Sequence, residues 1–123
     1  MAREEREANE IKGIVFCGSS LEDLKAFPAE VRREIGFALD RAQRGLTHHN
    51  AKPLRGFSGV FEIKSDYDGD TYRAVYAVKR REIYVLHCFQ KKSTRGIKTP
   101  KKEIDLIRRR LKIAQELAKE KEE

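Results

Sequence analysis

The dipeptide Asp68-Gly69 constrains this chain more than any other feature, because it predicts a tight turn between two alternating segments. Asp-Gly is favoured in two-residue hairpin loops, where both central residues need a positive φ. With this dipeptide at the centre of the turn, Lys64 faces Arg73 on the neighbouring strand. The alternation then directs one set of side chains toward a core: Phe61, Ile63, Tyr72, Ala74, Tyr76 and Val78.

The opposite face of the predicted hairpin carries Lys64 and Arg73 next to each other. Two like charges at a direct cross-strand position destabilise a sheet by roughly 0.2–1 kcal/mol. An anion bound between them would turn the repulsion into attraction, so the pair is a candidate anion site. Alternatively, both long side chains extend into water, and Glu62 and Asp66 reduce the repulsion.

Two long helices are predicted from apolar residues that recur every three or four positions. One follows Pro28, which suits the first turn of a helix, and the other begins with Thr99 as cap and Pro100 as first residue. A shorter helix is expected over residues 21–27. The apolar faces of the long helices are formed by Val31, Ile35, Ala38, Ala42 and Leu46, and by Ile104, Ile107, Leu111, Ala114 and Ala118.

The remaining segments complete the predicted fold. Residues 11–17 form a β-branched run typical of a buried strand, and residues 83–89 predict a third antiparallel strand. Residues 46–56 are predicted to form a basic loop. The order β-α-α-β-β-β-α in a single domain, residues 1–123, indicates the α+β class, with helices packed on a small antiparallel sheet.

The register of the third strand decides which side chain lies beside Arg73. If the preceding turn is centred on Arg80-Arg81, Cys88 faces Arg73, whereas a slip of one residue places His87 there. His87 is therefore a possible acid or base. A single histidine in an apolar strand is, however, more often packed in a core, and the sequence leaves both registers and both roles open.

Positive charge is concentrated in the middle of the chain. Residues 51–102 carry 13 Lys and Arg against 5 Asp and Glu, whereas the remainder is close to neutral. Lys101 and Lys102 are placed in the first turn of a helix, where cations oppose the helix dipole but suit a phosphate ligand. This concentration is expected for nucleic-acid binding. An acidic protein partner and a solvated loop are the alternatives.

Several other classes of protein are disfavoured. Cys17 and Cys88 lie in apolar runs, as expected for buried reduced thiols, and no Cys or His spacing predicts a metal site. We therefore expect no metal and no cofactor. The charged N-terminus is unlike a signal peptide, and no apolar run approaches the roughly 20 residues of a membrane span. These observations predict a cytoplasmic protein.

Four segments in order resemble a known toxin pattern: "VFEIK" (60–64), "YRAVY" (72–76), "VLHCFQKK" (85–92) and "TPKKEI" (99–104). They are similar to blocks of the phage-derived branch of the RelE/HigB toxins, in the RelE/ParE superfamily, and span about half of the chain. Lys64 stands where that branch usually has arginine, which keeps the charge but loses the bidentate fork. The link before Thr99 is also longer than usual.

This resemblance implies a RelE/ParE-like fold and a toxin held inactive by a cognate antitoxin, expected to be of the helix-turn-helix type. Many members of the group are endoribonucleases, or mRNA interferases, that cut mRNA on the ribosome without a metal. In that reaction the RNA 2′-OH attacks its own 3′-phosphate and leaves a 2′,3′-cyclic phosphate. Such chemistry needs a group for the hydroxyl proton, cations for the phosphate charge and an acid for the leaving oxygen.

The resemblance also implies roles for particular residues. Arg73 is expected to stabilise the phosphate with help from Lys64, and Lys91 or Lys92 to hold the phosphate or protonate the leaving oxygen. His87 is a further acid/base candidate. The expected RNA-anchoring residues are Lys52, Arg55, Arg95, Lys98, Lys101 and Lys102.

Two other functions remain open at this point. One is a ParE-like, non-catalytic toxin that inhibits gyrase, and the other is a plain RNA-binding module without toxicity. A shared fold does not decide between them. The predicted Lys64 and Arg73 pair favours RNA cleavage, because that reaction needs cations at the phosphate.

Overall fold

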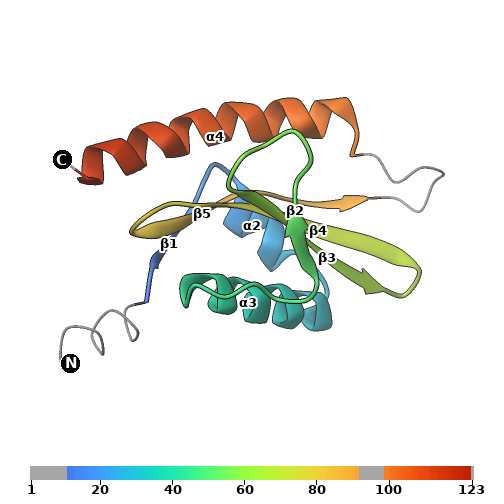
Figure 1. Ribbon diagram of the computed structural model, residues 1–123. Helices are drawn as coiled ribbons and strands as arrows, with labels where there is room; N and C mark the ends of the chain where they lie inside the picture. Colours follow the sequence, from blue (N-terminus) through green and yellow to red (C-terminus); the bar gives the residue numbers. More distant parts are fainter. Residues whose placement is uncertain (1–10, 92–98, 123) are drawn as a thin grey trace, which may run out of the picture.

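Residues 11–91 and 99–122 are described by the computed structural model. They form a five-stranded sheet in the order β1-β5-β4-β3-β2, with α2 and α3 on one face and α4 across the other (Figure 1). The strands are β1 (Gly13–Phe16), β2 (Ala51–Pro53), β3 (Val60–Tyr67), β4 (Asp70–Val78) and β5 (Glu82–Lys91). The helices are α2 (Ser20–Lys25), α3 (Ala29–Gln43) and α4 (Lys101–Glu122).

The α+β class is confirmed, but two strands differ from the predicted pattern. β1 pairs in parallel with β5, so the sheet is mixed rather than purely antiparallel. β2 lies inside the predicted basic loop and pairs antiparallel with β3. A three-residue strand is too short to show alternation, and a parallel neighbour that is distant in sequence leaves no local turn signal.

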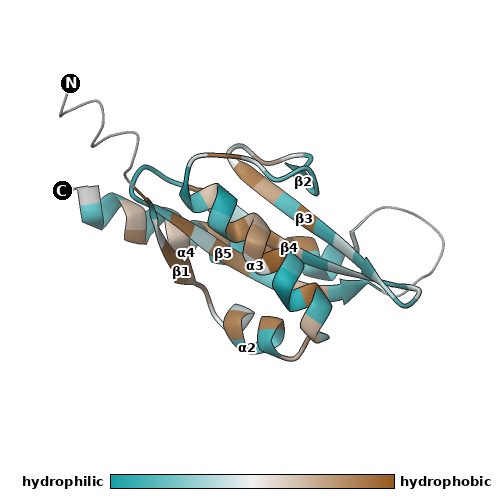
Figure 2. Cartoon of the chain, turned by 90° about the horizontal axis from the view of Figure 1, so that it is seen from below, coloured by the Kyte–Doolittle hydropathy of each residue, from teal (hydrophilic) through white to brown (hydrophobic). Residues whose placement is uncertain are grey.

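The predicted apolar face of the hairpin is buried against α3. Alternation of apolar and polar residues along β3 is visible from the α3 side in Figure 2. The prediction for Leu46 is wrong: this residue is 51% exposed, because α3 ends at Gln43 and Gly45, with φ of 81°, redirects the chain. The buried residues on this side include Val31, Ile35, Ala38, Ala42, Ile63, Tyr72, Ala74 and Tyr76.

A second core lies between the other face of the sheet and α4. The predicted apolar face of α4 is confirmed, with Ile107 and Ala114 fully buried. They pack in a cluster with Val75, Ala77 and Leu86 of the sheet. Because both faces of the sheet are covered, a polar side chain on the α4 face is buried unless it lies near an end or an edge.

The turn between β3 and β4 has the predicted conformation. Asp68 and Gly69 both have positive φ, of 53° and 84°, and Lys64 pairs with Arg73 as expected. The local turn chemistry therefore sets the register of the hairpin that carries the two cations.

Replacing Gly69 by alanine is expected to lower the free energy of unfolding by about 1–2 kcal/mol, because a Cβ disfavours the left-handed backbone. Gly36 is a matched control, because it lies inside α3 at negative φ and a Cβ added there would meet no atom within 4 Å. Gly36→Ala should instead stabilise the fold by about 0.5–1 kcal/mol. Urea denaturation measures both, and equal effects would contradict the turn assignment.

The register of β5 differs from both predicted alternatives. The turn is centred on Arg80-Arg81 as expected, and Tyr76 pairs with Val85, but a β-bulge follows and Arg73 pairs with Phe89. The bulge adds one residue to β5, which reverses the faces of all residues beyond it.

Beyond the bulge, His87 pairs with Val75, Phe89 with Arg73, and Lys91 with Thr71. Opposite residues of a ladder share a face, so His87, Phe89 and Lys91 lie on the same side of the sheet as Arg73. Cys88 instead enters the core beneath α3.

Both cysteines are buried free thiols, as predicted. Burial raises the pKa of Cys88 to about 12, so its thiolate is scarce at neutral pH. Over the described ranges, no helix is both long and apolar enough to cross a membrane.

Candidate functional site

The candidate site lies on the α4 face of the sheet, near the end where β5 finishes and α4 begins. The hairpin register brings Lys64 beside Arg73, and the β5 bulge adds Lys91 on the same face. Three of the five predicted catalytic residues are thus brought together by two different devices, a tight turn and a bulge.

Arg73 does not face an empty anion site, because a carboxylate of the protein lies beside it. Its Nη1 donates to Glu62 Oε1 over 2.7 Å, and the two side chains are only 9% and 16% exposed. The arginine Nε is buried and has no hydrogen-bond partner among the described residues. Arg73 is therefore positioned by Glu62 while part of its donor capacity stays unused.

Lys91 is the second cation of the site that has a buried nitrogen atom. Its Nζ is buried without a hydrogen-bond partner in the described part of the chain. Burial lowers the pKa of Lys91, the nearby charges of Arg73 and Lys64 lower it further, and Glu62 opposes them. A lowered pKa makes the ammonium group a stronger acid near neutral pH.

His87 lies on the same face but is tied to α4. Its Nε2 is 2.7 Å from Glu103 Oε1, and its ring stacks on Phe89 with centroids 4.7 Å apart. The His87 side chain is only 8% exposed. This arrangement agrees with a packed histidine that links β5 to α4, and an acid/base role for it remains a prediction.

The beginning of α4 differs slightly from the predicted cap. The helix starts at Lys101, so Pro100 occupies the capping position, and its carbonyl accepts the amide of Ile104. The Thr99 hydroxyl lies 3.5 Å from Glu62 Oε2 instead of capping the helix. The cap prediction was wrong by one residue, and Thr99 instead borders the carboxylate that holds Arg73.

An open hollow of about 540 Å³ adjoins the cations at the β2 edge of the sheet. Lys52, Lys64 and Arg73 contribute its positive charge. The other lining residues are Glu34, His49, Asn50, Glu62 and Asp66. Lys52 thus shares this hollow with Lys64 and Arg73.

The other predicted RNA-anchoring residues are spread more widely. Arg55 is exposed in the loop after β2 and does not line the hollow. Lys101 and Lys102 are exposed in the first turn of α4, and Lys101 pairs with Asp105 at 3.3 Å. Lys92, Arg95 and Lys98 lie outside the described residues.

Two carboxylates of the site were not predicted from the sequence as site residues. Glu62 was expected only to reduce the repulsion between cations, and no role was expected for Glu103. The ion pair of Glu62 with Arg73 depends on the strand register, and the contact of Glu103 with His87 depends on where α4 lies on the sheet. No local sequence motif predicts either of them. Within the described ranges, no group of three His, Cys, Asp or Glu side chains is arranged to hold a metal ion.

Comparisons with known proteins agree with the fold. Residues 22–112 match the family model described as phage-derived protein Gp49-like (DUF891). The isolated RelE toxin of E. coli is 21% identical, with a TM-score of 0.53 over 80% of this chain and 97% of that one. An arginine-to-alanine double mutant of RelE in the free state is also 21% identical, with a TM-score of 0.51 over 63% and 81% of the two chains. No curated protein matches the sequence.

Proposed function

This chain belongs to the family of phage-derived Gp49-like proteins and shares the fold of the RelE toxin, and from this premise we propose that it is the toxin of a toxin–antitoxin pair. Its proposed activity is cleavage of mRNA on the ribosome without a metal. The observation that carries the proposal is the cluster of Arg73, Glu62 and Lys91 beside an open hollow that Lys52 and Lys64 also line.

The proposed reaction begins with attack of the RNA 2′-oxygen on the adjacent phosphorus. The 2′-O–P bond forms, the P–O5′ bond breaks, and the products are a 2′,3′-cyclic phosphate and a 5′-hydroxyl. Charge builds on the phosphate oxygens during attack, and Arg73 and Lys64 would stabilise it. Lys64 is exposed on the rim of the hollow, where a phosphate has access.

Two protons must move in this reaction. Glu62 is the carboxylate of the cluster, and it would accept the 2′-hydroxyl proton while Arg73 fixes its orientation. Lys91, whose pKa is lowered, would donate a proton to the departing 5′-oxygen. Arg73 does not serve as the acid, because arginine stays protonated in proteins.

The RNA strand is proposed to run over the remaining cations. Lys52 lies in the hollow, and Lys101 and Lys102 lie at the exposed start of α4. Arg55, Lys92, Arg95 and Lys98 complete the proposed RNA-binding set. Contacts of this kind act on the phosphate backbone and weaken as salt rises.

Lys52→Ala is expected to weaken binding of a short single-stranded RNA by about 0.2–1 kcal/mol, at most roughly fivefold. The slope of log K against log salt should fall by about 0.7, because one phosphate contact is lost. Fluorescence anisotropy at several salt concentrations measures both values. Lys25→Ala removes the same charge from the exposed end of α2 and should change neither value. An equal effect of both variants would argue against a contact at Lys52.

Mapping of mRNA 5′ ends after induction of the protein tests the proposed function. New ends with 5′-hydroxyls inside translated frames, absent from untranslated transcripts, are expected. Trapped gyrase–DNA complexes with intact mRNA would instead indicate a ParE-like gyrase inhibitor. RNA binding without growth arrest would indicate a plain RNA-binding module.

The proposed partners are mRNA, the ribosome and a cognate antitoxin of the helix-turn-helix type, all in the cytoplasm. Co-expression with the protein encoded next to this gene should restore growth and yield a stable complex. If growth arrest continues although the neighbouring protein is present in stoichiometric amounts, that protein is not the antitoxin.

A further inference from the structure

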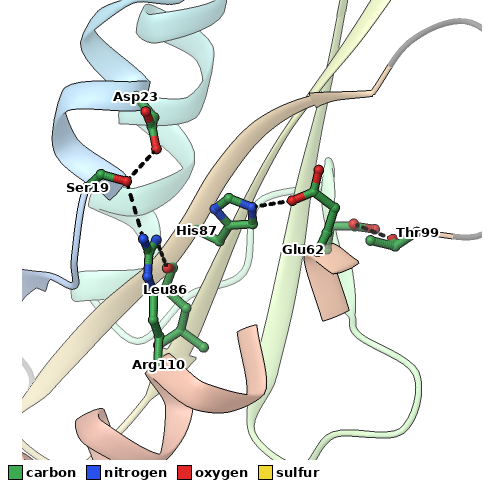
Figure 3. A network of polar contacts seen from close by, with 8 residues as sticks. Ser19, Asp23, Glu62, Leu86, His87, Thr99 and Arg110 are labelled. Carbon is green, nitrogen blue, oxygen red and sulfur yellow. Dashed lines mark hydrogen bonds and ion pairs between the residues drawn. The ribbon is translucent and has the colours of Figure 1, made fainter. Parts of the chain in front are cut away.

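The residue that the β5 bulge adds has its backbone carbonyl bound by a side chain of α4. Leu86 is the added residue, between the Val75–His87 and Tyr76–Val85 pairs, and it is fully buried. A buried carbonyl without a partner costs about 1–3 kcal/mol. Arg110 of α4 supplies the partner, because its Nη1 donates to the Leu86 carbonyl over 2.9 Å (Figure 3).

The same guanidinium also reaches the turn between β1 and α2. Arg110 Nη2 donates to Ser19 Oγ over 3.2 Å, and Ser19 Oγ donates to Asp23 Oδ2 over 2.9 Å (Figure 3). One side chain therefore joins α4, the bulge and the start of α2. The planar guanidinium suits this task, because its donors point in fixed directions.

Gly18 leaves the space that Arg110 occupies. A Cβ at this position would lie 2.6 Å from the guanidinium carbon, and Gly18 has φ of 55°, which disfavours other residues. On the other side of the bulge, the Val85 carbonyl accepts bonds from the Cys17 amide at 2.9 Å and Ser20 Oγ at 3.1 Å. Side-chain and backbone donors thus hold the carbonyls of Leu86 and of the preceding residue, Val85.

We propose that Arg110 is a positioning residue of the site, which holds the bulge that brings Lys91 and His87 onto the face of Arg73. This inference rests on the proposed ribonuclease function for its kinetic part only. Without the bulge, the ladder would continue with Cys88 opposite Arg73, and Lys91 would lie on the α3 face. Arg110 acts through the backbone of Leu86, at a distance from the reacting atoms.

Three variants test the proposal. Arg110→Met removes both donors and keeps most of the apolar stem, whereas Arg110→Lys keeps the charge and one donor group. Arg109→Met is the matched control, because Arg109 is an exposed neighbour of the same charge on the same helix. Thermal unfolding monitored by circular dichroism identifies any variant that fails to fold. If Arg110→Met fails to fold, Arg110→Lys is used in its place.

The first measurement is independent of catalysis. Cross-strand NMR contacts that pair Val75 with His87 and Ala74 with Cys88 should weaken or be replaced in Arg110→Met. Arg110→Lys should recover part of the native pattern, and Arg109→Met should match the wild type. Native contacts in Arg110→Met would overturn the proposal.

The second measurement is cleavage of ribosome-bound mRNA. A misplacement of about 1 Å can cost about 100-fold, so kcat of Arg110→Met should fall between about 10-fold and 100-fold while KM stays within about twofold. A loss confined to KM would overturn a positioning role. If the wild type cleaves no mRNA, the ribonuclease proposal fails, and the NMR contacts alone still decide whether Arg110 holds the bulge.

Discussion

Arg73→Ala is expected to reduce the rate of cleavage of ribosome-bound mRNA by about 100-fold to 1,000-fold, the usual effect of removing one donor that stabilises a developing oxyanion. The same variant should relieve growth arrest on induction. Arg73 combines a position opposite Lys64 with a buried ion pair to Glu62, so no other described cation can take its place. Single-turnover cleavage of mRNA in purified ribosomes measures the effect.

Folding must be separated from chemistry in this experiment, because Arg73→Ala leaves the half-buried Glu62 without its partner. Arg73→Lys keeps a cation beside Glu62 and should keep the melting temperature closer to wild type, but it loses the planar donor array. Arg80→Ala removes an exposed arginine from the turn before β5 and should cleave normally. Wild-type cleavage by Arg73→Ala would show that the phosphate is stabilised elsewhere.

Lys91→Met is expected to lower the cleavage rate by about 100-fold to 10,000-fold, the range for loss of a general acid. Only the protonated lysine can donate, so the wild-type rate should fall as pH rises through the pKa of Lys91. Burial and the charges of Arg73 and Lys64 lower that pKa from 10.5, which moves the decline toward neutral pH. Lys91→Arg should remove this decline and remain slow, because arginine keeps its proton.

A modified substrate distinguishes proton donation from simple charge stabilisation by Lys91. An RNA with sulfur in place of the 5′-bridging oxygen has a leaving group that needs no proton. Lys91→Met should cleave this RNA nearly as fast as the wild type does. Lys112→Met, an exposed lysine on α4, should behave as wild type with both substrates. An equal defect on both substrates would assign Lys91 to phosphate binding instead.

Features set by neighbouring residues were predictable from the sequence. Asp68 and Gly69 favour one turn conformation, and that turn determines the Lys64–Arg73 pairing without help from the rest of the fold. Helix faces were predictable for a similar reason, since burial repeats along the helix. The prediction that Leu46 is buried was wrong because α3 has already ended at Gln43. Apolar periodicity alone does not show where a helix ends.

Features set by distant residues were not predictable. The bulge at Leu86 depends on a donor from Arg110, 24 residues away in sequence, so extending the turn register along β5 gave the wrong neighbour for Arg73. Glu62 could be identified in the sequence, but its ion pair with Arg73 depends on how β3 and β4 lie in the sheet. The parallel pairing of β1 with β5 likewise depends on the whole chain.

The outer strands of the sheet limit how this protein can meet other chains. β2 has three residues and includes Pro53, which lacks an amide hydrogen, and β1 has four residues. Short edges with proline and lysine are poor templates for strand addition, so copies of the protein gain little by joining sheets. A protein partner is therefore expected to bind through helix surfaces and side-chain pockets and not by adding a strand at these edges.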